Sequence, residues 1–209
     1  MEYYPGKLIV IEGLDGSGKS TQSQILQKKL NSLGKKTYLS IKPTQFLIGG
    51  LIRSRLANDW ECSPECLQSL FLADHLFSLE KEIIPKLKQG INVISDRYIY
   101  STFAYGAINC DREWLKNINK NIPKPDITIF LDLSADKCID RIKKERFSTE
   151  LYEKKELLEK IRENYFESFK VFKTDAIITN GDDKIENISK KIITTITNLE
   201  DTSFDSDCL

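Results

Sequence analysis

The stretch GLDGSGKST at residues 13–21 constrains the fold more than any other part of this sequence. Gly13, Gly18, Lys19 and Ser20 match the pattern G-x-x-x-x-G-K-[ST] of a phosphate-binding P-loop. In such a loop, backbone N–H groups face phosphate oxygens, the lysine reaches the outer phosphates, and the hydroxyl binds Mg²⁺. The sequence therefore predicts a nucleotide site made by Gly13, Leu14, Asp15, Gly16, Ser17, Gly18, Lys19, Ser20 and Thr21.

Apolar runs of strand length alternate with amphipathic helical patterns along the chain. The expected strands are 8–12, 38–41, 91–95, 127–133 and 176–179. The clearest helical patterns cover 20–33, 151–172 and 185–199, with apolar residues three and four apart. Continuous apolar strands joined by helices predict an α/β fold of the P-loop NTPase type, with a five-stranded parallel sheet covered by helices on both faces.

The chain of 209 residues fits one domain, expected over residues 1–199. Residues 200–209 are acidic and polar, and we expect them to be a disordered tail. The segment 141–156 is dense in charge, which has two interpretations. It is either a solvated helix surface, or it contains a mobile basic lid over about 142–153.

The charge balance bears on possible partners. Lys and Arg number 31 and so do Asp and Glu, and this zero net charge argues against nucleic acid or a membrane surface as the main partner. No apolar stretch approaches the length of a membrane span, and no signal sequence precedes the first strand. The five cysteines have no paired metal spacing. These features predict a cytoplasmic protein with reduced thiols that binds small molecules.

A second motif, SDRYIYSTFAYG at 95–106, directly follows the third expected strand. Asp96 could hold Mg²⁺ through water, and Arg97 offers a planar fork for a phosphate group. The alternative is an ion pair at a helix start, with the aromatic residues in the core. Those aromatic residues are Tyr98, Tyr100, Phe103 and Tyr105.

With these motifs the sequence resembles the thymidylate kinases (dTMP kinases) of bacteria and archaea over about residues 7–199. The segments that carry the resemblance are LIVIEGLDGSGKST, the PT of KPTQFLIGGLIRSRL, LFLAD, SDRYIYSTFAY and KPDITIFLDL. The resemblance implies transfer of a phosphoryl group from ATP to dTMP, with Mg²⁺ as cofactor, by a homodimer. The rival interpretations are a kinase of another nucleoside monophosphate or of a deoxynucleoside, and a non-catalytic nucleotide-binding relative.

The resemblance also implies roles for residues on the side of the acceptor nucleotide. Asp15 would accept a hydrogen bond from the 3′-hydroxyl of the sugar, since a carboxylate accepts hydrogen bonds but cannot bind phosphate. Phe71 would stack on the pyrimidine, and Tyr105 would pack on the deoxyribose. Arg97 would hold the acceptor phosphate with help from Arg53. Alternatively, Asp15 faces solvent, both rings belong to the core, and Arg53 is a surface charge.

On the ATP side, the resemblance places Arg141 against adenine, with Asn180 and Gly181 lining the same edge. The alternative is that Arg141 is a charge on the surface of a helix. The predicted catalytic residues are Lys19, Asp15, Arg97 and Arg146.

The sequence departs from the family pattern at three places. His75 stands where the family has an arginine that bonds the thymine O4, and Gly106 follows Tyr105 where many relatives have glutamine. The lid lacks the usual arginine, because residues 150–153 read ELYE. Arg146 is then the best remaining cation for the transferring phosphoryl group, with Lys143 and Lys144 as reserves. We expect His75 to donate one hydrogen bond to a base carbonyl as a neutral imidazole.

Overall fold

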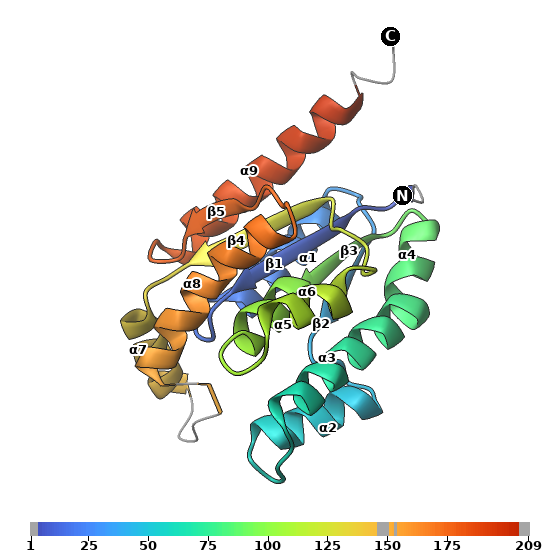
Figure 1. Cartoon of the computed structure of the whole chain (residues 1–209). Coiled ribbons are helices and arrows are strands. Elements are labelled where there is room, and N and C mark those ends of the chain that lie inside the picture. Colours follow the sequence, from blue (N-terminus) through green and yellow to red (C-terminus); the bar gives the residue numbers. More distant parts are fainter. Residues whose placement is uncertain (1–3, 146–150, 153, 205–209) are drawn as a thin grey trace.

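A computed structural model describes residues 4–145, 151–152 and 154–204 of the chain. Its strands form one parallel sheet in the order β2-β3-β1-β4-β5 (Figure 1). They are β1 (Leu8–Gly13), β2 (Thr37–Ile41), β3 (Asn92–Asp96), β4 (Ile127–Asp132) and β5 (Ile177–Asn180). All five strands lie where the apolar runs predict them, so the predicted parallel sheet is confirmed.

The helices follow the strands in alternation. They are α1 (Lys19–Ser32), α2 (Leu47–Leu56), α3 (Pro64–Ser78), α4 (Ile84–Lys88), α5 (Ile99–Gly106), α6 (Arg112–Asn119), α7 (Ala135–Glu145), α8 (Lys155–Val171) and α9 (Ile185–Phe204). A π-helical turn, Leu79–Ile83, joins α3 to α4. Ser63 caps α3 by accepting a hydrogen bond from the Cys66 N–H at 3.1 Å, and Pro64 occupies the first turn, where its missing N–H is not needed.

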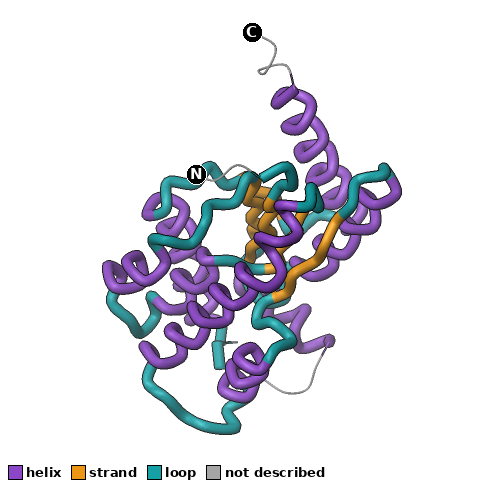
Figure 2. Tube along the Cα trace, turned by 90° about the vertical axis from the view of Figure 1, so that its right-hand side faces the viewer, coloured by secondary structure: helices purple, strands orange, loops and turns teal. Residues whose placement is uncertain are grey.

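Side chains of the fully buried central strand β1 alternate between two hydrophobic clusters. Ile9 and Ile11 pack with apolar residues of α1 and α9 on one face of the sheet. Leu8 and Val10 pack with the aromatic cluster of α5 and α8 on the other face. Because successive side chains of a strand point to opposite faces of the sheet, helices can pack on both faces. Figure 2 shows the strands enclosed between helices. The predicted three-layer arrangement is confirmed.

Three boundaries differ from the expectations. Helix α9 continues through Phe204, so the backbone is helical within the segment expected to be disordered from residue 200, and 205–209 lie outside the described residues. Helix α8 begins at Lys155 rather than near 151. The expected lid starts inside α7, and its residues 146–150 and 153 lie outside the described part of the chain. No helix within the described ranges is long and apolar enough to cross a membrane.

Candidate active site

The P-loop connects β1 to α1 and depends on glycine at points of close packing. Gly16 has φ +77°, and a Cβ there would lie 2.5 Å from the backbone oxygen of Cys138 in α7. A Cβ on Gly13 would lie 2.5 Å from the Ser17 Oγ and 2.9 Å from the backbone oxygen of Leu131. The loop therefore lies directly against α7 and the end of β4, where a larger residue would displace it.

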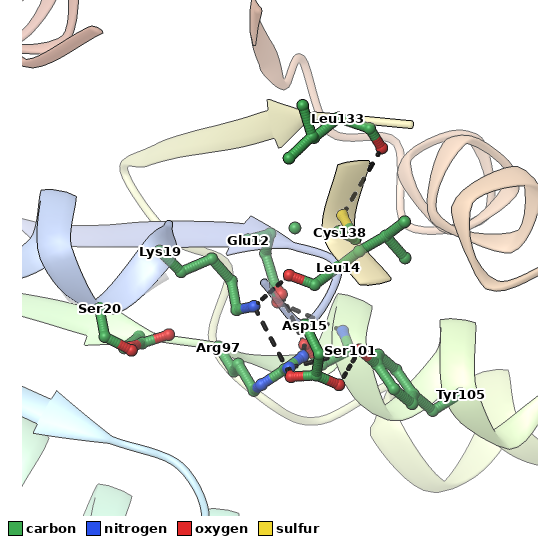
Figure 3. Close-up of polar contacts among 12 residues, drawn as sticks. Glu12, Leu14, Asp15, Lys19, Ser20, Arg97, Ser101, Tyr105, Leu133 and Cys138 are labelled. Carbon is green, nitrogen blue, oxygen red and sulfur yellow. Dashed lines mark hydrogen bonds and ion pairs between the residues drawn. The ribbon is translucent and has the colours of Figure 1, made fainter. Parts of the chain in front are cut away.

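Lys19 and Ser17 are buried polar residues of the loop, and both line the cavity. Lys19 is only 6% exposed, and its Nζ donates a hydrogen bond of 2.6 Å to the backbone oxygen of Leu14 (Figure 3). Burial, followed by the charge of Arg97, lowers the pKa of Lys19. The buried Ser17 Oγ has no hydrogen-bond partner among the described residues. A buried ammonium group of this kind fits phosphate oxygens as ligands.

Asp15 points into the site, so the alternative of a solvent-facing carboxylate is wrong. One of its oxygens accepts a hydrogen bond from the Arg97 guanidinium, and the other accepts one from the Tyr105 hydroxyl at 2.7 Å (Figure 3). The Lys19 Nζ lies 4.0 Å away. Burial alone would raise the pKa of Asp15, but the charges of Arg97 and Lys19 and the bond from Tyr105 together lower it to about 2. Asp15 is therefore an anion held by cations at neutral pH.

The second motif lies beside the P-loop because β3 pairs with β1, with Asp96 opposite Ile11. Arg97 follows directly after this pair. The residue has φ +75°, which lets the chain turn directly from β3 toward α5. Its Nη1 donates to the Ser101 Oγ at 3.1 Å and to the Tyr165 hydroxyl at 3.3 Å. Hydrogen bonds to several residues thus hold the Arg97 guanidinium in the site.

Ser20 and Asp96 form the candidate magnesium site. The Ser20 Oγ donates a 2.6 Å hydrogen bond to an Asp96 carboxylate oxygen, so both oxygens lie at one point beside the P-loop. The described residues contain no group of three or more His, Cys, Asp or Glu side chains that could hold a metal ion. Mg²⁺ commonly keeps waters and uses one or two protein oxygens with substrate phosphates, so this pair fits an ion that arrives with a nucleotide.

Glu12 is a site residue that sequence reasoning missed. It is fully buried in β1 and accepts hydrogen bonds from the Tyr98 and Ser101 N–H groups, at 2.8 and 3.2 Å. It also accepts from the hydroxyls of Ser101 and Tyr165, at 2.6 and 3.1 Å. Burial raises its pKa to about 7, although these bonds and the charges of Arg97 and Lys19 lower it. Glu12 fixes the start of α5 behind Arg97. A carboxylate in an otherwise apolar strand was the available signal.

One cavity of about 790 Å³ joins the two motifs. Most predicted site residues line it, namely Asp15–Thr21, Arg53, Phe71, His75, Asp96, Arg97, Tyr105 and Arg141. Gly13 and Leu14 support the loop from behind. Arg146 lies outside the described residues. Tyr100 and Phe103 are buried in the core, as the alternative for them predicted, and Tyr98 is buried but also lines the cavity.

The two other predicted arginines are tied to the site and are not free surface charges. The Arg141 Nη2 donates to the backbone oxygen of Gly181 at 3.0 Å, and its Nη1 donates to that of Ser17 at 3.4 Å. Arg141 thereby bridges the P-loop and the loop after β5, the predicted adenine edge. The Arg53 Nη1 donates to the backbone oxygens of Pro43 and Thr44, the first at 3.1 Å.

His75 lies inside the cavity wall and is 3% exposed. Its ring centre is 5.0 Å from that of Tyr98, and neither ring nitrogen has a partner among the described residues. Burial, and then the nearby charge of Lys42, holds the pKa of His75 well below its usual range, so the ring is neutral at pH 7. The buried Lys42 would also repel an arginine at position 75, which gives a physical reason for this departure.

Comparison with known proteins gives a consistent result. The family model for thymidylate kinase matches residues 11–192. A probable thymidylate kinase of Thermococcus kodakarensis is 36% identical over 200 residues, which cover 91% of this chain and 97% of that protein. A thymidylate kinase of Brachyspira hyodysenteriae is 36% identical over 166 residues, 78% of this chain and 81% of that protein. A probable thymidylate kinase of Pyrobaculum aerophilum is 40% identical over 158 residues, 75% of this chain and 80% of that protein. A P-loop joined through one cavity to the Asp96–Arg97 motif, together with these matches, establishes that the chain belongs to the thymidylate kinase family.

Proposed function

We propose that this protein is an ATP-dependent kinase that transfers the γ-phosphoryl group of ATP to dTMP, giving dTDP and ADP for the synthesis of dTTP. The observation that carries the proposal is the single cavity of about 790 Å³. It runs from the P-loop to Phe71, so two nucleotides can meet end to end within it. Arg97 and Arg53 line the same cavity as the P-loop, and a phosphate group on the acceptor would give both guanidinium groups a ligand, which favours a nucleoside monophosphate over a nucleoside.

Each nucleotide has its own set of residues in this proposal. The phosphates of ATP bind the P-loop N–H groups, Lys19 and the Ser17 hydroxyl, and Arg141 lies along adenine. The phosphate of dTMP binds Arg97 and Arg53, while its sugar contacts Tyr105 and donates its 3′-hydroxyl to Asp15. Asp15 already accepts bonds from Arg97 and Tyr105. A carboxylate has acceptor sites to spare for a third donor.

The chemistry requires positioning and charge stabilisation more than proton transfer. The attacking atom is a phosphate oxygen that already carries negative charge, so no general base is needed. Lys19 and Arg97 both approach the same Asp15 carboxylate oxygen and supply positive charge where the phosphoryl group would pass. Ser20 and Asp96 would hold Mg²⁺, which neutralises phosphate charge when it is bound. The cation that completes the site stays a prediction from the sequence, namely Arg146, with Lys143 and Lys144 as alternatives.

The proposal includes a cytoplasmic location, which the cysteine usage and the N-terminal sequence predict, and a homodimer, which the family resemblance implies. In the structure, Phe46, Leu47 and Leu51 expose large apolar side chains around α2, with Leu47 90% exposed. Leu76 of the adjacent α3 is also half exposed. A second copy of the chain would bury this surface.

The substrate assignment can be tested with purified protein and a coupled assay of ADP release. The panel is dTMP, dUMP, UMP, dCMP and dGMP, each with ATP and Mg²⁺. We expect a clear preference for dTMP in kcat/KM. Equal use of the panel would favour a nucleoside-monophosphate kinase of broad specificity, and no turnover with any of them would favour a binding protein.

The P-loop assignment has a separate test. Lys19→Met should abolish transfer, because it removes the buried ammonium group that faces the phosphates, while thermal unfolding stays within a few degrees of wild type. Lys29→Met, an exposed lysine of the same helix, is the control and should leave turnover unchanged. Preserved turnover in Lys19→Met would contradict the assignment.

A further inference from the structure

Gly106, the last residue of α5, packs so closely against its neighbours that there is no room for a side chain. A Cβ at this position would lie 2.8 Å from the Leu115 Cδ2 and 3.0 and 3.2 Å from the Cδ and Cγ of Gln68. Many of the relatives that the sequence resembles carry glutamine at this position. In this chain the side chain of a different glutamine, from α3, fills the adjacent space.

Gln68 is a buried polar residue beside the cavity. It is 1% exposed, and its side chain lines the cavity between α3 and α5. The Gln68 Oε1 is buried, and no described residue donates a hydrogen bond to it. A buried amide oxygen normally has a partner because its desolvation is unfavourable. Because Gln68 lines the cavity, a molecule bound there could supply the missing donor after a small rotation of the carboxamide.

Phe71 and His75 follow Gln68 on the same face of α3, at spacings of three and seven residues. All three line the cavity. Phe71 offers a flat apolar surface, while His75 adds two ring nitrogens without partners among the described residues. The face of α3 thus presents an aromatic ring between two unsatisfied polar groups. This combination suits a planar heterocycle that stacks on its face and forms hydrogen bonds at its edge.

We propose that Gln68 is a specificity-determining residue that reads the imide edge of the pyrimidine of the acceptor nucleotide. Its Oε1 accepts the N3–H of the base, and its Nε2 donates to the C4 carbonyl. Paired bonds from one carboxamide to adjacent donor and acceptor atoms of a base are a common mode of recognition. Glycine at 106 is then required, because it leaves space for Gln68. The inference rests on the proposed function and names the residue that selects its substrate.

The test compares wild type with Gln68→Met, which keeps the volume of the side chain and removes both hydrogen bonds. The substrates are dTMP, dUMP and dTMP methylated at N3. We expect kcat/KM to fall about tenfold or more for dTMP and dUMP, which share the imide edge. The N3-methylated substrate lacks the N–H, so its kcat/KM should change by less than about threefold. The KM for ATP should stay unchanged.

Thermal unfolding separates recognition from a purely structural role. Without nucleotide, Gln68→Met should unfold at the same temperature as wild type or higher, because an unsatisfied buried group is removed. The rise in unfolding temperature on adding dTMP should shrink, since ligand stabilisation follows affinity. Ser69→Ala, at an exposed position of the same helix, is the control and should match wild type in both measurements.

Equal falls in kcat/KM for all three substrates, or no fall for any, would overturn the role of Gln68 while leaving the kinase assignment intact. Wild-type protein that neither binds nor phosphorylates dTMP would overturn the proposed function and this inference together.

Discussion

At the scale of single residues, the site shows how an anion can belong to a phosphate-binding loop. Asp15 sits among Arg97, Lys19 and Tyr105, which hold its pKa near 2. The carboxylate in turn orients Arg97 through their ion pair and offsets the repulsion between Arg97 and Lys19. Asp15 thus fixes the position of the cation that would grip the acceptor phosphate, and it leaves acceptor capacity for a sugar hydroxyl.

The buried carboxyl group of Glu12 should make the stability of the protein depend on pH. Its pKa is raised from 4.5 to about 7, so the folded state favours the protonated form. The contribution of protonated Glu12 to the stability of the folded state is fully present below pH 4.5 and is lost as the pH rises through 7. The shift of 4.5 to about 7 corresponds to about 3 kcal/mol in the free energy of unfolding. Glu12→Gln keeps an acceptor for the two N–H groups and should remove this pH dependence.

Urea unfolding of both proteins between pH 5 and pH 8 measures the effect. The difference between the two proteins isolates Glu12 from other titrating groups, such as His75. Stability that changes with pH in parallel in the two proteins would show that Glu12 stays ionised in the folded state.

At the scale of elements, the P-loop depends on contact between β1, α1 and α7. Gly16 touches the backbone of α7 at Cys138, while Arg141 of the same helix reaches the Ser17 carbonyl. The phosphate loop is therefore held from both the strand that precedes it and a helix more than a hundred residues later. Its shape is a tertiary property as well as a local one.

Two glycines with similar backbones test this dependence. Gly16 and Gly34 have φ values of +77° and +80°, so alanine is strained at either, by about 1 kcal/mol. Gly34 has no neighbour within 4 Å, whereas a Cβ on Gly16 meets α7. We expect Gly34→Ala to lower stability slightly and leave kinetics unchanged. Gly16→Ala should lower stability further and raise the KM for ATP about tenfold or more. Equal KM values in the two variants would show that the loop moves freely away from α7.

At the scale of the whole molecule, the sheet order places the loops after β1 and β3 side by side, where open α/β sheets bind their ligands. Helices α2 and α3 form an arm beside this edge and supply Arg53, Gln68, Phe71 and His75 to the cavity (Figure 1). The outer surface of the same arm exposes Phe46, Leu47 and Leu51. Pairing of two chains through this surface would therefore also steady the wall that holds the acceptor nucleotide.

The proposed dimer leads to a prediction about mass. Light scattering should give about twice the chain mass of 24.1 kDa for wild type. The double variant Leu47→Glu/Leu51→Glu should give the mass of one chain, because two carboxylates would be buried in the interface. We expect its KM for dTMP to rise more than its KM for ATP. Leu33→Glu, an exposed leucine after α1, is the control and should remain dimeric. A wild-type protein of single-chain mass would refute the proposed dimer.

The strands, the main helices and the phosphate loop could all be predicted from local sequence patterns. Strand and helix periodicity follow from which face each residue buries, and the glycine spacing of a P-loop is a local backbone requirement, so both are readable from neighbouring residues. The sequence also predicted Asp96, Arg97 and Arg141 near the loop, through their positions after strands or by resemblance.

The contacts between buried polar groups became known only from the three-dimensional packing. Glu12 bonds to Ser101 and Tyr165, the charge of Lys42 acts on His75, and Gln68 packs against Gly106, although the members of each set are distant in the chain. Sequence spacing cannot reveal these contacts, because burial and charge act over distances in space that are set by the packing of α3, α5 and α8 around the sheet.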